Sequence, residues 1–131
     1  MEYLLDTNIC IYLLKGRYGL VDKIESIGFE NLFISEITVA ELKYGVERSA
    51  TPEKNRLIIN QLINRFKILP IFGALDVYAR EKARLKKEGN IVDDLDLLIG
   101  ATAVENNMVL VTNNEKHFVR LQHIKVENWT K

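Results

Sequence analysis

Residues 3–14 read Tyr-Leu-Leu-Asp-Thr-Asn-Ile-Cys-Ile-Tyr-Leu-Leu, so a single carboxylate, Asp6, separates two apolar runs. Residues 3–5 are predicted as a short buried strand, and residues 9–14 as a short helix stopped by Gly16. An aspartate at such a junction commonly caps the helix that follows. A second interpretation is functional, because ligands of parallel α/β sheets bind beyond the carboxyl ends of the strands.

The rest of the chain alternates between segments predicted as strands and segments predicted as helices. Further strands are expected at residues 32–34, 68–72, 109–111 and, at an edge, 124–126. Helices are expected at residues 20–27, from Ser35 or Thr38 through 46, from Thr51-Pro52 through 66, at 75–88 and at 95–104. This alternation predicts an α/β fold with a central, mostly parallel sheet covered on both faces. With 131 residues and 47% hydrophobic composition, we expect one domain over residues 1–131.

Composition and charge narrow the class of protein. The formal net charge is +0 and the sequence pI is 6.7, so the basic signature typical of nucleic-acid-binding proteins is absent. We find no apolar stretch long enough to span a membrane, and no signal-peptide pattern in the first residues. The single cysteine, Cys10, lies in an apolar segment and cannot form an internal disulfide. Together these features favour a cytoplasmic location.

Two further carboxylates lie in segments that otherwise look buried. Glu41 stands three residues after Thr38, which fits a capping box as well as a functional role. Asp96 lies in an apolar helix whose cap is already supplied by Asp93 or Asp94. An ionised carboxylate in such a place needs a partner, and the sequence offers no basic residue on the same stripe. We therefore interpret Asp96 as functional.

Carboxylates gathered at one edge of a sheet repel one another unless a cation lies among them. Mg²⁺ and Mn²⁺ prefer oxygen ligands of this kind, and they can activate water and polarise a phosphoryl group. Neutral oxygens could come from Thr7, Thr112, Asn113 and Asn114, although turn chemistry is the plainer interpretation of Asn113. Zinc is not expected, because the chain has one cysteine and its two histidines lack helical ligand spacing.

Four stretches of this sequence resemble one known family. They are LLDTNICIYLLK at residues 4–15, ISEITVAELKYGVERS at 34–49, DLDLLIGATAVENNMVLVTNNEKHF at 94–118 and VENW at 126–129. In this order they resemble a PIN-domain ribonuclease, and more narrowly the VapC-type toxin of bacterial toxin–antitoxin pairs. The resemblance runs from Met1 to Trp129. It implies a Rossmann-like, three-layer α/β/α fold.

The resemblance also implies a set of site residues. The three acids of the family's site match Asp6, Glu41 and Asp96, which would hold the metal and carry catalysis. A fourth acidic position of many members falls on Asn114, which would orient water or metal. Gly100 stands where alanine is usual, and Asp93 and Asp94 replace a pairing that often contains proline. Either aspartate could supplement the metal site, with helix capping as the plainer interpretation.

The activity implied by the resemblance is that of an endoribonuclease that depends on Mg²⁺ or Mn²⁺. The targets in this family are structured RNAs, often tRNA or ribosomal RNA. The family forms homodimers and is silenced by a small VapB-type antitoxin, whose C-terminal segment enters the active-site groove. Operator DNA is bound through the antitoxin in this family, so no direct DNA contact is expected for this chain. No membrane partner is expected either.

Other interpretations remain open at this point. A catalytically inactive PIN-like module would bind RNA or a partner without cleaving it. A receiver domain would need paired acids after the first strand and an aspartate after the third, and residues 68–72 carry none. A phosphatase of the haloacid dehalogenase type would need a second acid at Asn8. Basic clusters that could contact RNA phosphates lie at Lys15 and Arg17, at Lys82, Arg84, Lys86 and Lys87, and at Lys116, His117 and Arg120.

Overall fold

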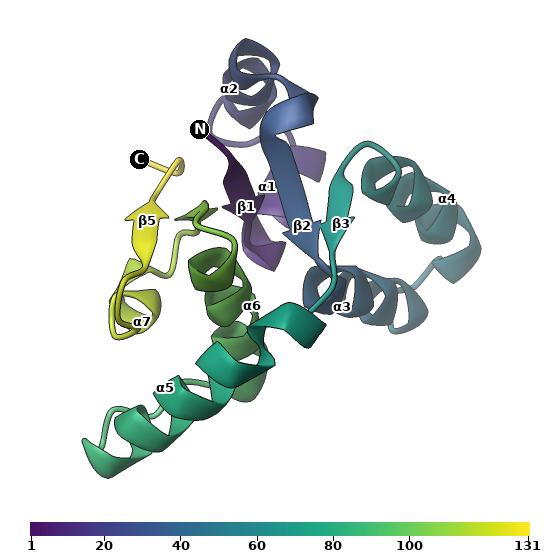
Figure 1. The fold of residues 1–131 in the computed structure, drawn as a ribbon. Coiled ribbons are helices and arrows are strands. Elements are labelled where there is room, and N and C mark those ends of the chain that lie inside the picture. Colours follow the sequence, from purple (N-terminus) through teal and green to yellow (C-terminus); the bar gives the residue numbers. More distant parts are fainter.

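A computed structural model of the chain describes residues 1–131. Its centre is a five-stranded sheet in which every neighbouring pair of strands runs parallel. The strands are β1 (Tyr3–Leu5), β2 (Leu32–Ser35), β3 (Lys67–Leu69), β4 (Val109–Val111) and β5 (Lys125–Glu127). They lie in the order β3-β2-β1-β4-β5, with β1 in the middle (Figure 1). The prediction of a mostly parallel sheet is therefore confirmed, as is the edge position of the last strand.

Helices connect the strands and form the two outer layers. They are α1 (Thr7–Leu14), α2 (Leu20–Ile27), α3 (Glu36–Glu47), α4 (Pro52–Ile63), α5 (Leu75–Lys87), α6 (Asp94–Glu105) and α7 (Glu115–Phe118). Two short 3-10 turns, η1 (Phe29–Asn31) and η2 (Phe72–Ala74), precede β2 and α5. In Figure 1, α5 extends away from the sheet and lies against α6.

Each face of the sheet has its own apolar core, because successive side chains of a strand point to opposite faces. Leu5 packs on one face with buried residues of α1, α2, α3 and α4. Leu4 packs on the other face with Ile99 of α6 and Phe118 of α7. The result is a three-layer α/β/α arrangement. Because all strands are parallel, their carboxyl ends lie along the same edge of the sheet.

Several elements differ from prediction in their bounds. α4 ends at Ile63 instead of residue 66, and β5 covers residues 125–127 instead of 124–126. α1 begins at Thr7 instead of residue 9, because Asp6 caps it directly after β1. β3 covers residues 67–69 instead of 68–72. Pro70 follows this strand and has no N–H to donate to the sheet, so the ladder ends there.

Two predicted helix starts also need correction. α3 starts directly after Ser35, whose side chain caps it. Thr38 therefore lies inside the helix, and the capping box predicted with Glu41 is wrong. Thr51 precedes α4 as predicted, but its hydroxyl makes no capping hydrogen bond. Pro52, at the first position of α4, is the part of that start signal that the structure confirms.

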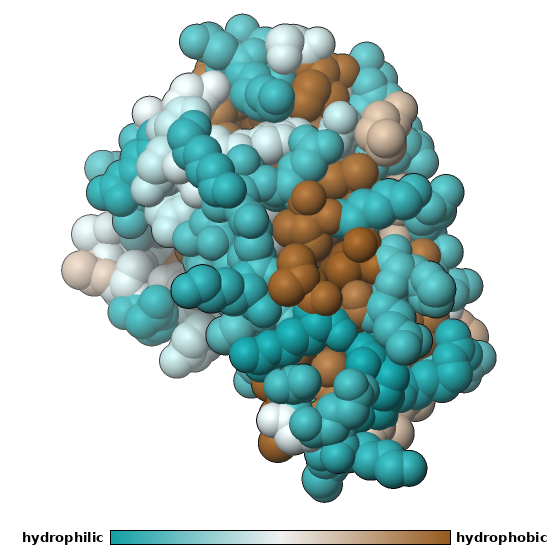
Figure 2. All heavy atoms as spheres, turned by 90° about the vertical axis from the view of Figure 1, so that its left-hand side faces the viewer, coloured by the Kyte–Doolittle hydropathy of each residue, from teal (hydrophilic) through white to brown (hydrophobic).

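The face that carries β5 and α7 is mostly hydrophilic, with a strip of hydrophobic residues at its centre (Figure 2). Val119, just after α7, is 61% exposed, and Ile91 is 69% exposed. Cys10 is fully buried, as predicted. None of the helices combines the length and the apolar composition that crossing a bilayer requires.

Candidate active site

Asp6 lies between β1 and α1 at the centre of the sheet edge and is 4% exposed. Its Oδ1 accepts a hydrogen bond of 2.8 Å from the backbone N–H of Thr7, which confirms the predicted helix cap. Its Oδ2 accepts a hydrogen bond of 2.8 Å from the hydroxyl of Thr112, just beyond β4. Only one oxygen therefore serves the cap, while the other is held by the neighbouring strand end.

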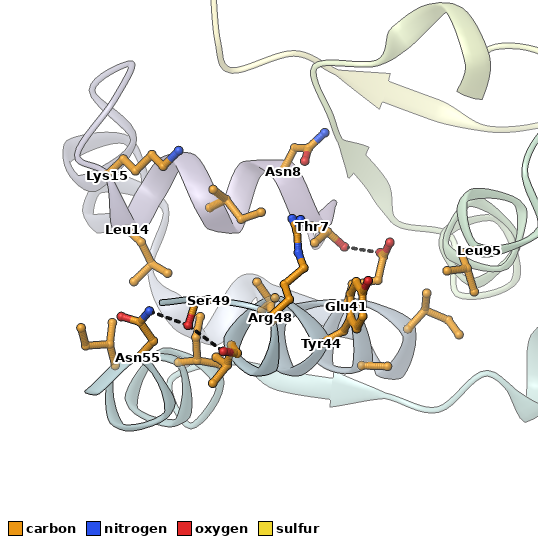
Figure 3. A pocket seen from close by; sticks show the side chains of 18 residues that line it. Thr7, Asn8, Leu14, Lys15, Glu41, Tyr44, Arg48, Ser49, Asn55 and Leu95 are labelled. Carbon is orange, nitrogen blue, oxygen red and sulfur yellow. Dashed lines mark hydrogen bonds between the residues drawn. The ribbon is translucent and has the colours of Figure 1, made fainter. Parts of the chain in front are cut away.

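Glu41 lies next to Asp6 because Thr7 connects the two. The hydroxyl of Thr7 donates a hydrogen bond of 2.7 Å to Oε1 of Glu41 on α3 (Figure 3). The hydroxyls of Thr7 and Thr38 lie 3.1 Å apart in a buried contact. Thr38, inside α3, thus links this helix to α1.

Asp96 lies in the first turn of α6 and is half-buried. Its carboxylate forms neither an ion pair nor a hydrogen bond, so the partner that the sequence analysis calls for is not supplied by a protein side chain. Burial is the main cause that raises the pKa of Asp96 to about 6. The negative charges of Asp6, Asp93 and Glu41 raise the pKa of Asp96 further, and His117 opposes them.

The charges of Asp6 and Glu41 thus act on Asp96, which places the three predicted carboxylates near the same edge of the sheet. Burial also raises the pKa of Asp6, and the charge of Glu41 contributes to that shift. As the side chains stand, no three Asp, Glu, His or Cys residues form a cluster that could hold one metal ion. The donor chemistry, carboxylates with hydroxyl oxygens beside them, fits a hard divalent cation. Joint binding would require at least one side chain to turn, and Asp96 has no hydrogen bond to hold it.

Asn114 and Asn113 follow β4 and complete the same edge. The backbone N–H of Asn114 donates a hydrogen bond of 3.0 Å to the hydroxyl of Thr112, and its amide nitrogen lies 2.9 Å from Nδ1 of His117. The amide of Asn113 donates a hydrogen bond of 3.1 Å to the hydroxyl of Tyr12, while its buried Oδ1 has no partner. Asn113 therefore bridges to α1, beyond the turn role that its sequence position indicates.

The acids at the start of α6 have structural partners. Oδ2 of Asp93 accepts a hydrogen bond of 3.2 Å from the N–H of Leu95, so Asp93 is the predicted cap. Asp94 forms an ion pair of 2.9 Å with Lys82 and accepts a hydrogen bond of 2.9 Å from the hydroxyl of Tyr78. Asp94 is therefore engaged with α5 and not with the other carboxylates.

A groove of about 950 Å³, lined by Glu41 among others, runs between α1, α3 and α4. Apolar side chains, among them Ile11 and Leu14 of α1, make up most of its lining. Figure 3 shows Thr7 and Glu41 toward one end of this groove, and Asn55 toward the other. An apolar surface is thereby continuous with the acidic edge of the sheet.

Comparison with known proteins agrees with this geometry. The sequence matches the family described as PIN domain over residues 3–124. A ribonuclease VapC2 of Rickettsia felis is 37% identical over 134 residues, covering 100% of both chains. A tRNA(fMet)-specific endonuclease VapC of Shigella flexneri is 30% identical over 131 residues, covering 99% of each. This chain belongs to the VapC family of PIN-domain ribonucleases.

The solved structures support the same placement of this VapC-family chain. VapBC2 of Rickettsia felis, bound to a DNA fragment from its promoter, superposes with a TM-score of 0.90 at 34% identity. The superposition covers 98% of this chain and 99% of that one. The predicted PIN-like, three-layer fold is confirmed.

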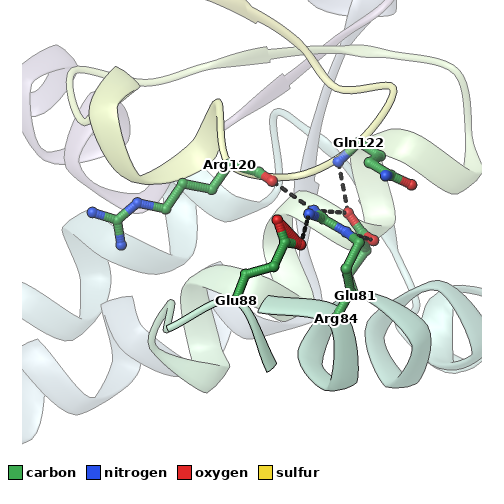
Figure 4. A network of polar contacts seen from close by, with 5 residues as sticks. All are labelled: Glu81, Arg84, Glu88, Arg120 and Gln122. Atoms are coloured by element: carbon green, nitrogen blue, oxygen red, sulfur yellow. Dashed lines mark hydrogen bonds and ion pairs between the residues drawn. The ribbon is translucent and has the colours of Figure 1, made fainter. Parts of the chain in front are cut away.

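Sequence reasoning missed one polar network of this VapC-family chain. Glu81 on α5 is 6% exposed, and its two carboxylate oxygens accept hydrogen bonds of 2.9 Å from Arg84 (Figure 4). The N–H of Gln122 donates a further hydrogen bond of 2.6 Å to Glu81, and Arg84 donates one of 2.7 Å to the carbonyl of Arg120. The spacing of the two charges on one helix was the only signal in the sequence. The network fixes the segment that follows α7.

The basic clusters now differ in their availability for RNA. Lys82 is paired with Asp94, and Arg84 is enclosed by the network just described. Lys15 and Arg17, which follow α1, are exposed and form no ion pair. Lys86 and Lys87, at the end of α5, are likewise exposed and unpaired, so both clusters retain cations that could contact phosphates.

Proposed function

We propose that this VapC-family chain is an endoribonuclease toxin that depends on Mg²⁺ or Mn²⁺ and cleaves structured RNA, tRNA or rRNA, at phosphodiester bonds. The observation that carries the proposal is the position of the carboxylates: Asp6 follows β1 at the carboxyl end of a parallel strand, and Thr7 joins it to Glu41 by hydrogen bonds. Burial raises the pKa of Asp96, in the first turn of α6, and the charges of both acids raise it further. Groups with perturbed ionisation in such a place are typical of functional sites. Relatives that are ribonucleases over their full length support the same activity.

Asp6, Glu41 and Asp96 are the residues that would hold the cation. When bound, such a cation supplies positive charge opposite a scissile phosphate and makes a water molecule more acidic. Thr7 and Thr112 would keep two of the carboxylates oriented, since each donates a hydrogen bond to one of them. Asp96 would be the adjustable ligand, because it is ionised at neutral pH and has no hydrogen bond to break.

Asn114 completes the proposed catalytic set. Its backbone is tied to Thr112, which in turn donates to Asp6, so its position is coupled to that of the first carboxylate. Its amide would orient a water molecule or a phosphate oxygen. Asn114 carries no charge, so we propose that it assists the three acids by orienting water or metal.

The proposed partner is a cognate VapB-type antitoxin. The apolar groove beside Glu41 offers a surface for an antitoxin segment whose end would reach the carboxylates. The related VapBC2 was solved on a fragment of its promoter, so we propose that operator DNA is bound through the antitoxin. We also propose that this chain acts as a homodimer.

The proposal is tested by incubating the purified protein with tRNA(fMet), total tRNA and ribosomal RNA. The choice of the first RNA follows the relative that is 30% identical. We expect endonucleolytic cleavage with Mg²⁺ or Mn²⁺, none with EDTA, and none by Asp96→Asn. Asp94→Asn, on the same helix but paired with α5, is the matched control and should cleave as the unmodified protein does. RNA that is bound in every condition and never cut would identify an inactive binding module instead.

A further inference from the structure

Two tyrosines next to the candidate active site form a pair that the proposed catalytic set does not use. Tyr12 lies on α1, and Tyr18 follows the helix end. Their ring centroids lie 5.1 Å apart, with an interplanar angle of 80°. Tyr18 is 51% exposed. The ring of Tyr12 therefore packs against the ring of Tyr18, which still faces solvent.

The chain turn after α1 builds this pair. Gly16 adopts a φ of 66°, and its N–H donates to the carbonyl of Leu13. The N–H of Arg17 donates a hydrogen bond of 3.0 Å to the carbonyl of Tyr12, which completes a Schellman turn. Tyr18 itself has a φ of 60°, a left-handed conformation that is costly for a residue other than glycine. Costly backbone conformations of this kind are concentrated at functional sites.

One hydrogen bond connects Tyr12 to the segment that follows β4. The hydroxyl of Tyr12 accepts a hydrogen bond of 3.1 Å from the amide of Asn113. The neighbouring residue, Thr112, donates its hydroxyl to Asp6. The hydroxyl of Tyr12 therefore reaches the residues that follow β4, and the ring of Tyr12 packs against the exposed ring of Tyr18.

The charges around the pair suit a nucleic-acid strand. Lys15 and Arg17 lie on either side of Gly16, are exposed and form no ion pair. Exposed aromatic rings beside free basic side chains are the usual combination in proteins that bind single-stranded RNA. Structured RNAs present unpaired bases in their loops, and such bases stack on aromatic side chains.

We propose that Tyr18, braced by Tyr12, is the platform on which an unpaired base of the RNA stacks next to the scissile phosphate. Lys15 and Arg17 contact the phosphates that flank this base. Tyr18 thereby contributes to substrate selection, because a base that is paired within a stem cannot reach the ring. The inference rests on the proposed ribonuclease function and adds a binding subsite to it.

The test uses a stem-loop RNA that spans the cleavage site mapped with the unmodified protein, with 2-aminopurine placed at each loop position in turn. Binding is measured by fluorescence in the Asp96→Asn background, so that the RNA stays intact. Tyr18→Leu removes the aromatic face but keeps apolar bulk, and Tyr18→Phe keeps the face and removes only the hydroxyl. Thermal unfolding of both variants confirms that they are folded.

We expect Tyr18→Leu to weaken RNA binding by about 5- to 150-fold, the range for one stacked base. Tyr18→Phe should bind within about twofold of the parent protein, as one stacked face is retained. At one loop position, 2-aminopurine should be quenched by the parent and by Tyr18→Phe, and not by Tyr18→Leu. In the cleavage-competent protein, Tyr18→Leu should raise KM and leave kcat nearly unchanged.

Two failures are distinguishable. If the unmodified protein cleaves RNA while Tyr18→Leu binds and quenches as the parent does, the stacking platform is refuted and the nuclease function stands. If the unmodified protein neither binds nor cleaves RNA, the proposed function and this inference fall together.

Discussion

The hydroxyl of Thr112 donates a hydrogen bond of 2.8 Å to Oδ2 of Asp6, across a sequence separation of 106 residues. The same hydroxyl accepts a hydrogen bond from the N–H of Asn114. The neutral side chain of Thr112, just beyond β4, thus positions both the carboxylate of Asp6 and the backbone of Asn114. This relationship makes Thr112 a positioning residue that can be tested separately from the acids.

Thr112→Val should lower the free energy of unfolding by about 1 to 3 kcal/mol, because it leaves buried groups without a hydrogen-bond partner. It should also raise the pKa of Asp6 further, since the bond from Thr112 opposes the effect of burial. We expect reduced cleavage, measured together with urea unfolding. Thr112→Ser keeps the hydroxyl and should restore most of both properties. Equal losses in the two variants would show that the hydroxyl is not the cause.

Asp96→Asn should stabilise the fold while it abolishes cleavage. Burial and neighbouring carboxylates raise the pKa of Asp96 to about 6 from an ordinary 3.8, so its charge opposes folding at neutral pH. After allowance for partial solvent exposure, the gain should be about 1 to 2 kcal/mol at pH 7. Asp94→Asn, which removes an exposed ion pair, should change stability by less than about 1 kcal/mol.

The stability difference between Asp96→Asn and the unmodified protein should depend on pH. Asp96 of the folded protein takes up a proton as the pH falls through about 6, which relieves the repulsion in the unmodified chain. The stability advantage of Asp96→Asn should therefore be full above that pH and shrink toward zero near the ordinary pKa of an aspartate. Urea unfolding at a series of pH values measures it. An advantage that stays constant between pH 4 and pH 7 would be inconsistent with a buried, crowded carboxylate.

Glu81→Gln should destabilise the fold by about 2 to 3 kcal/mol, because it leaves Arg84 without its partially buried partner. The pKa of Glu81 is lowered, chiefly by the hydrogen bonds from Arg84, so this contribution is present at neutral pH. It is lost as the pH falls below the ordinary value of 4.5, where the two proteins should converge. Glu88→Gln removes an exposed partner of Arg84 and should cost less than about 1 kcal/mol in thermal unfolding.

Gly100→Ala should be close to neutral or destabilising, by about 0 to 2 kcal/mol. A Cβ at this position would lie 2.7 Å from Cδ2 of Leu121 and 3.3 Å from Cδ1 of Phe118. The crowding of the new Cβ therefore offsets the gain in helix propensity from glycine to alanine. Gly45→Ala on α3 is the matched control, because its Cβ meets no atom within 4 Å, and it should stabilise by about 0.5 to 1 kcal/mol. A clear gain at Gly100 would show that the contact relaxes without cost.

The fold was accessible from the sequence because its strongest signals are local. The apolar run before Asp6 and the helical spacing in residues 20–27 and 75–88 predict elements that the structure contains. The prediction failed where a residue suited to helix capping instead makes a contact between helices. Thr38 and Glu41 have the spacing of a capping box, yet Thr38 and Glu41 both contact Thr7, which no local rule can foresee.

The sequence singles out the acids and names Thr7 and Thr112 near them, but it does not show which atoms these threonines contact. Asp96 stands out in an apolar helix, so its sequence context alone points to function. The hydrogen bond of Tyr12 to Asn113 and the clamp of Glu81 on Gln122 join positions far apart in the chain. Only the folded topology brings such partners together.

Asp6, Glu41 and Asp96 are proposed to hold one divalent cation jointly. Titration calorimetry of Mn²⁺ into the purified protein tests it without reference to any RNA. We predict saturable Mn²⁺ binding that is weakened at least tenfold, by about 1.4 kcal/mol, in Asp96→Asn and in Glu41→Gln, and that is unchanged in Asp94→Asn. Equal Mn²⁺ affinity in all four proteins would contradict the claim.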